Sequence, residues 1–401
     1  MTSELVVVGI GADGWAGLSE PSRSAISSAE VILGSARQLD LLPSAVAGVR
    51  VAWPSPLLPA LPGLLDEHRD RAVCVLASGD PMFHGIGATL VRLVGADRVR
   101  VLPHPSSASL AAARLGWPLA SASVDVVSLV TAPVSSLLAA VNPGRRVLVL
   151  SAGADTPSLV AALLTAHGYG DSPVTVLEQL GGPTERIYTG LASAWAHPAG
   201  DPLNVVAIDC AGGPAVSGVP GLPDSLFDSD GQLTKREIRA VTLSALAPTP
   251  GELLWDVGAG SGSIAIEWMR SHASCRAVAV EPVPERAARI MRNATSLGVP
   301  GLRVVEGRAP AALAGLPAPS AVFIGGGLTR DGVVEACLDA LGSGGRLVAN
   351  AVTVESEAVL ASWYAKLGGE MTRIAVNRAA PVGGFTGWRA MMPVTTWSVT
   401  R

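Results

Sequence analysis

The sequence has no long hydrophobic run, few aromatic residues and only four cysteines. Its apolar runs are broken by Gly, Pro or a charge, whereas a membrane helix needs about 20 apolar residues and a signal peptide needs a basic start. We therefore expect a soluble, cytoplasmic protein with no membrane partner. The cysteines lie far apart without a C-x-x-C pair, which argues against a zinc ribbon or a disulfide scaffold.

The remaining composition is that of a large α/β protein. A chain of 401 residues exceeds one ordinary core, so two domains of about 200 residues are expected. Hydrophobic residues make up 49% and charged residues 15%, which is enough burial to offset chain entropy. Abundant Ala, Val, Leu and Gly with only 4% aromatics fits layers of helices on sheets.

Charge is unevenly distributed along the chain. Residues 1–230 carry 12 basic and 20 acidic side chains, whereas residues 231–401 carry 17 basic and 13 acidic ones. The second half therefore suits an anionic ligand better.

A segment rich in Gly, Pro, Ser and Asp, AGGPAVSGVPGLPDSLFDSDG, separates the strand LNVVAI from the helical stretch TKREIRAVTLSAL. This is linker composition, so we predict domains at residues 1–212 and 213–401. The second half then alternates strands with helices, which predicts a parallel, doubly wound sheet. The expected strands are LLWDVG, RAVAVE, LRVVEG, AVFIGG and GRLVANA; the expected helices are SIAIEWMR, residues 284–297 and a stretch from Arg330.

The stretch VVVGIGADG has the spacing G-x-G-x-x-G at residues 9–14. A dinucleotide site needs a helix directly after the third glycine and an acid at the end of the next strand. A helix there would carry Gly17 and run into Pro21, so the better helix start has Ser19 as cap. Glu30 precedes the strand VILG and is at its wrong end. We predict a sharp turn rather than an NAD site.

The stretch WDVGAGSGS has the better context, because a strand precedes it and an amphipathic helix follows. Its glycines are Gly258, Gly260 and Gly262, so the third dinucleotide glycine is missing. Glu281 ends the following strand, where a carboxylate can accept both hydroxyls of a ribose. Together with Asp256 beside the turn, this pattern favours S-adenosylmethionine over NAD.

These motifs resemble the class I methyltransferase pattern. In order, TKREIRA, LLWDVGAGSGSIAIEW, VVEGRAP and VFIGGG resemble the C-terminal part of the decarboxylating precorrin methyltransferases of cobalamin biosynthesis, over about residues 222–350. The resemblance implies a Rossmann-like class I fold. The donor contacts that it implies are Thr234, Gly258, Ala259, Gly260, Ser261, Gly262, Glu281, Gly307, Arg308 and Ala309.

The first half resembles the tetrapyrrole (corrin and porphyrin) methylases, a two-lobed α/β fold. The resemblance is carried by VVVGIGADG, ASGDPMFHGIG, PSSASLAAARLGWP and EQLGGPTERIYTG. It implies a second donor site in a cleft between the lobes. The residues implicated are Gly11, Gly79, Asp80, Phe83, Ser106 and Ser107. Ala12 and His104 depart from the family pattern, which has Pro and Gly at these places.

The combined resemblance implies methylation of a reduced precorrin at carbons 5 and 15, with loss of carbon dioxide from the acetate on carbon 12. Two S-adenosylmethionine sites are implied, no metal is needed, and a homo-oligomer is expected. Catalytic candidates are Lys235, Arg236 and His104. Because Arg is the natural clamp for carboxylates, candidates for binding the anionic tetrapyrrole are Arg236, Arg330, Arg378 and Arg389. We also expect Thr234 to cap its helix in a capping box with Glu237, and Gly325–Gly327 to admit the flat macrocycle.

Two alternatives stay open from the sequence. The second half could be a nucleic-acid methyltransferase, although FIGGG replaces the Asn-Pro-Pro-aromatic motif of such enzymes, and we expect no nucleic-acid partner. The first half could instead be a degenerate scaffold that only binds the substrate.

Overall fold

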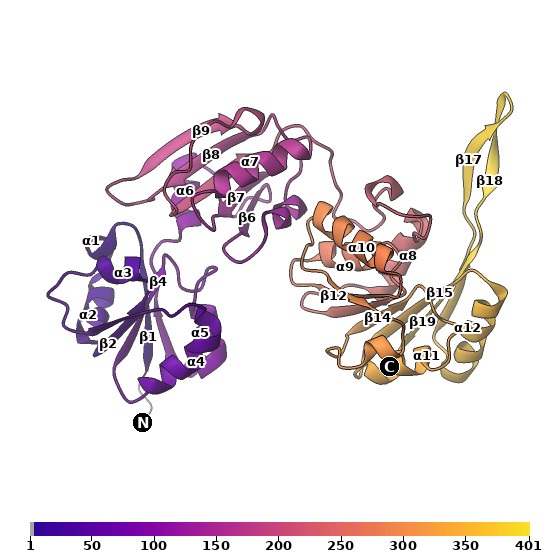
Figure 1. Cartoon of the computed structure of the whole chain (residues 1–401), viewed down its shortest axis with the longest axis horizontal. Helices are drawn as coiled ribbons and strands as arrows, with labels where there is room; N and C mark the ends of the chain where they lie inside the picture. The colour runs from indigo at the N-terminus through magenta and orange to yellow at the C-terminus, as the bar shows by residue number, and fades with distance from the viewer. Residues whose placement is uncertain (1–3) are drawn as a thin grey trace. The chain divides into compact units, whose positions relative to one another are not determined.

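The computed structural model describes residues 4–401, which form two compact units (Figure 1). The N-terminal unit holds residues 4–134 and Ala140–Pro214, and the C-terminal unit holds Ser135–Ala139 and Ala215–Arg401. No helix in the described part of the chain is both long and apolar enough to cross a bilayer.

The first lobe of the N-terminal unit is a five-stranded, fully parallel sheet in the order β3-β2-β4-β1-β5. Its strands are β1 (Leu5–Ile10), β2 (Val31–Gly34), β3 (Val49–Ala52), β4 (Val73–Ser78) and β5 (Val99–Leu102). Its helices are α1 (Gly14–Gly17), α2 (Glu20–Ser28), α3 (Ala36–Asp40), α4 (Leu57–Glu67), α5 (Gly87–Val94) and the 3-10 turn η1 (Ala96–Arg98). Buried Val, Ile and Leu on β1, β2 and β4 pack against helices on both faces, as a parallel sheet requires.

The second lobe contains a mixed five-stranded sheet in the order β6-β7-β10-β8-β9, in which only β6 and β7 are parallel. The strands are β6 (Val124–Ser128), β7 (Arg146–Leu150), β8 (Pro173–Glu178), β9 (Arg186–Leu191) and β10 (Asn204–Asp209). The helical elements of this lobe are α6 (Ser107–Leu115), α7 (Thr156–Ala166) and η3 (Ala192–Ala194), whereas all of η2 (Val134–Ala139) except Val134 belongs to the C-terminal unit.

The glycine-rich turn after β1 differs in part from its prediction. Ser19 does cap α2, because its hydroxyl accepts the backbone N–H of Ser22 at 3.3 Å, and Pro21 lies in the first turn. A single helical turn, α1, nevertheless begins at Gly14. It avoids the clash with Pro21 by ending at Gly17, after which the chain is extended. The prediction of a turn without a helix was wrong in this respect.

The C-terminal unit is a seven-stranded sheet in the order β13-β12-β11-β14-β15-β19-β16. The first five strands are parallel, and β19 is antiparallel to both of its neighbours. Its strands are β11 (Leu253–Val257), β12 (Arg276–Glu281), β13 (Arg303–Glu306), β14 (Ala321–Ile324), β15 (Arg346–Ala351), β16 (Glu370–Ile374) and β19 (Val394–Thr400). Its helical elements are η4 (Asp224–Leu226), α8 (Arg236–Leu246), α9 (Ser263–Ser271), α10 (Pro284–Ser296), η5 (Ala311–Leu313), α11 (Val333–Ala340) and α12 (Val354–Leu367).

The predicted alternation of strands and helices up to β15 is confirmed, with one shifted boundary. The helix expected from Arg330 begins three residues later, because Gly332 adopts a positive φ of 76° as the N-cap of α11. Neighbouring residues of the central strand β11 point to opposite faces. Leu254 joins one core cluster with Trp268, and Trp255 joins the other with Trp397. This two-sided burial explains why the strands read as continuous apolar runs.

A hairpin between β16 and β19 was not anticipated from the sequence. It consists of β17 (Asn377–Val382) and β18 (Phe385–Ala390), which pair only with each other. Figure 1 shows the hairpin extending away from the seven-stranded sheet. Phe385 and Trp388 on it are 85% and 78% exposed, so no core holds it in place.

The segment with linker composition is partly packed onto the C-terminal unit. The buried carboxylate of Glu267 accepts the backbone N–H groups of Gly221 and Leu222 at 2.6 and 3.0 Å. The same carboxylate pairs with the fully buried Arg239, which also reaches Asp224. These bonds satisfy a buried charge pair and attach residues 221–224 to α8 and α9.

Candidate functional site

A pocket of about 660 Å³ opens at the carboxyl ends of the parallel strands of the C-terminal unit. It lies where the strand order reverses, since the chain goes from β11 to β12 and β13 on one side and to β14 and β15 on the other. Such switch points are where open α/β sheets bind ligands. The predicted residues that line it are Thr234, Lys235, Gly258, Ala259, Gly260, Glu281, Gly307, Arg308, Ala309, Gly325–Gly327 and Arg330.

The bend after β11 requires its glycines for local backbone reasons. Gly258, Gly260 and Gly262 have φ values of 72°, 61° and 77°, a region that disfavours side chains. A Cβ on Gly258 would lie 2.6 Å from the backbone of Gly326, so the bend also needs close approach to the loop after β14. Gly262 and Ser261 support the bend but do not line the pocket.

Glu281 holds this bend from the end of β12. The residue is buried, and its Oε2 accepts the N–H of Gly260 at 2.8 Å while Oε1 accepts that of Val283 at 3.1 Å. Each oxygen keeps a further lone pair, so the carboxylate can still accept two sugar hydroxyls. A floor without side chains beside such a carboxylate fits a nucleoside cofactor.

Asp256 lies beneath the bend and does not line the pocket. Its Oδ2 accepts the N–H of Ala265 at 3.1 Å, which attaches the start of α9 to β11, while Oδ1 has no partner among the described residues. Burial raises the pKa of Asp256 to about 7, and the negative charge of Glu281 adds to this rise. The carboxyl group therefore titrates near neutral pH.

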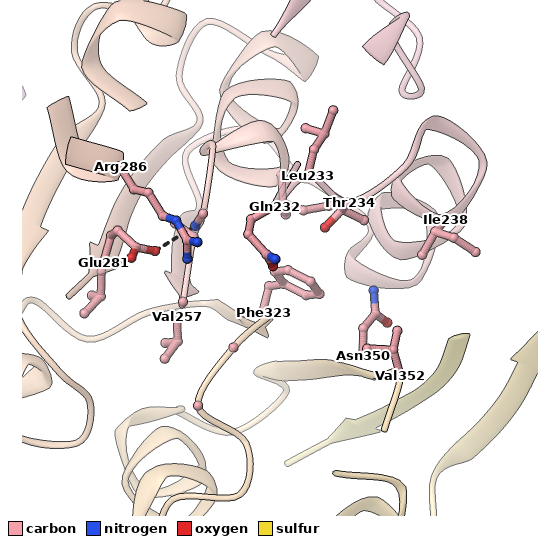
Figure 2. Close-up of a pocket in the computed structure, with 18 of the residues that line it drawn as sticks. Gln232, Leu233, Thr234, Ile238, Val257, Glu281, Arg286, Phe323, Asn350 and Val352 are labelled. Atoms are coloured by element: carbon pink, nitrogen blue, oxygen red, sulfur yellow. Dashed lines mark hydrogen bonds between the residues drawn. The ribbon is translucent and has the colours of Figure 1, made fainter. Parts of the chain in front are cut away.

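The pocket is rich in positive charge. Glu281 is the one acidic side chain among the described residues that line it. Four cations line it from separate elements: Lys235, Arg286, Arg308 and Arg330. Figure 2 shows Glu281 and Arg286 on one side of the pocket, with Asn350 and Val352 on the other. This balance suits an anionic ligand.

Residues 228–235, which we call the strap, cover the glycine bend. The carbonyl oxygen of Gln232 lies 3.0 Å from where a Cβ on Gly260 would be. Two carboxylates attach the strap to α10: Asp230 pairs with Arg286 at 2.8 Å, and Asp228 pairs with Arg292 at 2.8 Å. The hydrogen bond from Arg286 holds the pKa of Asp230 well below its usual range. Arginines at three-residue spacing on α10 were the sequence signal that could have revealed these pairs.

Two expectations about the start of α8 were wrong. Thr234 lines the pocket but does not cap the helix, because Lys235 occupies the N-cap position and no side chain caps it. Glu237 cannot complete a capping box, since its carboxylate binds Arg378 at 2.6 Å instead.

Of the four arginines proposed to bind the substrate, the structure brings only Arg330 to the pocket. Arg378 and Arg389 face each other across the hairpin, and Arg378 is held by Glu237 and Asp224. Arg236 is also absent from the lining. Sequence reasoning missed the apolar wall at the base of the hairpin, because its residues come from separate stretches. They are Val352, Val376, Met391, Met392 and Val394.

A second cleft, of about 330 Å³, lies between the lobes of the N-terminal unit. Five of the residues implicated from the sequence line it: Gly11, Gly79, Phe83, Ser106 and Ser107. Asp80 does not; its Oδ1 accepts the N–H of Met82 at 2.8 Å and shapes the loop. Ser106 also caps α6, because its hydroxyl accepts the N–H of Ser109 at 3.1 Å.

His104 does not line the cleft either. Its Nε2 lies 3.2 Å from the carboxylate of Asp13, and a Cβ on Gly11 would lie 2.8 Å from the same nitrogen. The histidine thus packs beneath the turn after β1. Sequence reasoning missed Arg37, Gln38 and Trp53, which do line the cleft.

Comparison with known proteins assigns both halves of the chain. The family of Tetrapyrrole (Corrin/Porphyrin) Methylases matches residues 4–195, and the Precorrin methyltransferase domain family matches residues 225–401. A precorrin-6Y C(5,15)-methyltransferase [decarboxylating] from Sinorhizobium sp is 52% identical over 99% of this chain and 96% of its own length.

Two shorter relatives resemble part of the chain. A Pyrobaculum calidifontis protein, provisionally named cobalt-precorrin-6B C(15)-methyltransferase (decarboxylating), is 37% identical over 44% of this chain and 93% of its own length. The crystal structure of the C-terminal domain of precorrin-6Y C5,15-methyltransferase from Rhodobacter capsulatus is 48% identical, covers 46% of this chain and 100% of its own, and has a TM-score of 0.44.

Proposed function

The chain belongs to the family of decarboxylating precorrin-6Y C(5,15)-methyltransferases, and from this premise we propose that each of its two folds carries out one of the two methylations. It is an S-adenosylmethionine-dependent methyltransferase of cobalamin biosynthesis that acts on a precorrin and releases carbon dioxide. Domains 1–212 and 213–401 each bind one donor molecule in this proposal.

The C-terminal unit methylates carbon 15 and removes the carboxyl group, and the N-terminal unit methylates carbon 5. The name of the Pyrobaculum relative covers carbon 15 and decarboxylation alone, and that protein aligns with less than half of this chain, which supports a separable second activity. The presence of a lined pocket in each unit supports the same division.

The observation that carries the proposal is the bond between Glu281 and the glycine bend. Glu281 receives the N–H of Gly260 at 2.8 Å, so the sugar-binding carboxylate and the bare floor of the pocket are held as one unit. The donor supplies an electrophilic methyl group on a sulfonium. The work of the protein is to align the reacting carbon with that methyl, since orientation dominates such displacements.

The substrate half of the pocket is defined by charge and by the apolar wall. Lys235, Arg308 and Arg330 bind the substrate carboxylates, with Arg offering the bidentate geometry. Met391 and Met392 line the same pocket and provide an apolar setting, which favours loss of a carboxylate as neutral carbon dioxide. Gly325–Gly327 leave room for a flat ring beside the donor.

Two measurements test this proposal. Calorimetric titration of the full chain with S-adenosylhomocysteine should give two sites, and Glu281→Gln should remove or weaken one and leave the other. Incubation with isotopically labelled donor and reduced precorrin, followed by mass spectrometry, should show two methyl groups gained and one carbon dioxide lost.

One observation favours a second candidate for the N-terminal unit. No carboxylate of the described residues lines its cleft, so no side chain there repeats the role of Glu281. The unit would then be a scaffold that binds the tetrapyrrole without donor. A single S-adenosylhomocysteine site per chain, with one methyl transferred, would favour this candidate over two active units.

A further inference from the structure

The cleft of the N-terminal unit contains a charge that no step above uses. Arg37 is the one Lys, Arg, Asp or Glu side chain that lines it within residues 4–401. The other lining residues are mostly apolar, hydroxyl-bearing or glycine, with His84, Gln38 and Asn204 among them, so this guanidinium is the one permanent charge in the described lining.

Arg37 is held at the cleft and remains available to a ligand. It lies on α3, whose capping box between Ser35 and Gln38 fixes the helix start. One bond to a described residue holds the guanidinium, a donation to the hydroxyl of Ser78 at 3.1 Å. The amide of Gln38 donates to the same hydroxyl at 3.0 Å. An Arg side chain has five N–H donors, so most of its capacity is free for a ligand.

No carboxylate of the described residues forms an ion pair with Arg37. Asp201 acts on it only through its field, and the carboxylate of Asp201 is itself bound by the amide of Gln179 at 2.9 Å. Burial lowers the pKa of Arg37, which is the signature of a guanidinium that has lost water without gaining a close partner. An anionic ligand would supply the ion-pair partner that this half-buried guanidinium lacks among the described residues.

Strand order decides which ligand reaches it. The parallel strands run β3-β2-β4-β1-β5, and all their carboxyl ends face the cleft. The residues implicated in donor binding follow β4, β1 and β5: Gly79, Gly11 and Ser106–Ser107. Arg37 follows β2, and Trp53 follows β3. The backbone N–H of Trp53 donates to the carbonyl oxygen of Gly34, the last residue of β2, at 2.9 Å. Arg37 and Trp53 thus follow the two strands that lie on the far side of β4 from β1 and β5, and the guanidinium of Arg37 reaches back to Ser78 at the end of β4.

We propose that Arg37 binds a side-chain carboxylate of the tetrapyrrole in the cleft of the N-terminal unit, with Trp53 packed against the ring beside it. The pairing joins a planar cation to a carboxylate and an aromatic face to a flat macrocycle. The inference rests on the proposed function, because it places the substrate and not the donor at β2 and β3.

The test uses the full chain and uroporphyrin, a stable tetrapyrrole whose side chains are all carboxylates. The readout is the quenching of the fluorescence of Trp53, obtained as the difference between each protein and the same protein carrying Trp53→Phe. We expect Arg37→Gln to raise the half-quenching concentration about tenfold or more, the usual effect of losing one charge-assisted pair. The half-quenching concentration of Arg37→Lys should fall between those of the unmodified chain and Arg37→Gln, because lysine keeps the positive charge but cannot form the bidentate pair of a guanidinium.

One control separates this effect from loss of folding or of net charge, and one further variant tests the anchor of Arg37. Arg92→Gln removes a charge from α5 of the same lobe, where the hydrogen bonds of Arg92 to described residues go to Ala88 and Thr89 of its own helix. Ser78→Ala removes the anchor of Arg37 and keeps the guanidinium. Arg92→Gln should leave quenching within twofold and Ser78→Ala within a few-fold.

The outcomes are distinct. If Arg37→Gln and Arg92→Gln had the same half-quenching concentration, the inference would be overturned and the proposed function would stand. Loss of S-adenosylhomocysteine affinity in Arg37→Gln, with unchanged affinity for an analogue lacking the carboxylate, would assign Arg37 to the donor and also overturn it. Absence of any Trp53 quenching in the unmodified chain would overturn both, since the cleft would then not admit a tetrapyrrole.

Discussion

The two pockets lie at the same kind of place, the carboxyl edge of parallel strands, but their linings differ in chemistry. The C-terminal pocket is lined by one carboxylate and four cations, with a glycine bend held in positive φ. Among the described residues, the N-terminal cleft is lined by one arginine, together with glycines, serines, His84, two amide side chains and apolar side chains. The first recognises ligands through charge, whereas the second has mainly backbone groups, hydroxyls and shape available.

Because their linings differ, the two sites are sensitive to different kinds of substitution. A pocket built on charged side chains loses function when one charge is neutralised, even if the glycine bend keeps its conformation. A cleft built on backbone groups depends on loop geometry, and the bond between Asp80 and Met82 and the pair between His104 and Asp13 maintain that geometry. Variants that act on one pocket alone therefore test the comparison.

The largest effect is expected for Gly258→Ala. The new Cβ would meet the backbone of Gly326 at 2.6 Å at a φ of 72°, so the bend and the loop after β14 must move apart. Such overpacking and strain together cost about 3 kcal/mol or more. Binding of S-adenosylhomocysteine at the C-terminal pocket should fall about a hundredfold or more, with the N-terminal site unchanged.

The matched control is Gly251→Ala. Gly251 also has a positive φ, 87°, but no atom lies within 4 Å of its added Cβ. It should lower stability by about 1 kcal/mol and leave titration with S-adenosylhomocysteine as in the unmodified chain. Equal loss of binding in both variants would mean that backbone strain, and not the approach to Gly326, governs the site.

The next largest effect is expected for Glu281→Gln. Loss of a charged acceptor for two hydroxyls costs about 1.5–3 kcal/mol, so affinity at the C-terminal pocket should fall about tenfold to a hundredfold. Glu306→Gln is the control, because Glu306 is the register partner of Glu281 on β13 but does not line the pocket. Calorimetry should separate the two variants; indistinguishable titrations would remove Glu281 from the sugar site.

A smaller effect is expected from the titration of Asp256. Its pKa in the folded state is about 7 against an ordinary value of 3.8, so the folded state holds its proton more tightly than the unfolded state does. The resulting stabilisation is complete below 3.8, declines as pH rises toward 7 and is lost above it, with a slope of up to about 1.4 kcal/mol per pH unit.

Asp256→Asn should abolish that slope, because the amide does not ionise. Urea unfolding at several pH values between 4 and 8 would show the difference between variant and parent growing in favour of the variant as pH increases. Asp331→Asn, at an exposed position of the same unit, should show no such trend. A parallel pair of curves for Asp256→Asn and the parent would contradict the raised pKa.

The smallest effect is expected for the double variant Asp228→Asn with Asp230→Asn. Both pairs with α10 are exposed to solvent, and exposed ion pairs contribute little. Affinity for S-adenosylhomocysteine at the C-terminal pocket should fall about twofold to fivefold at low salt, with the difference vanishing near 1 M salt. Glu285→Gln, in the first turn of α10, controls for charge. A large, salt-independent loss would mean that these two carboxylates hold the strap more strongly than exposed ion pairs do, and no loss at all would mean that the strap is held by its other contacts.

Several elements could be predicted because their cause is local. The strands of the C-terminal sheet are buried on both faces, so each one reads as an apolar run. The bend at 258–262 needs residues that tolerate positive φ, and three glycines provide it. The position of Glu281 could be predicted because it is the last residue of the apolar run that forms β12. The capping of α8 was predicted wrongly because Glu237 pairs with Arg378, which lies 141 residues away.

The layered α/β architecture, the glycine bend with its carboxylate and the family of the chain could be inferred from the sequence alone, because these depend on neighbouring residues and on strand periodicity. Which of the arginines reach a pocket, how the strap covers the bend, and that Arg37 and Trp53 line one cleft became known from the tertiary structure. Those features bring together side chains that are distant in the chain, and their meeting depends on strand order and packing.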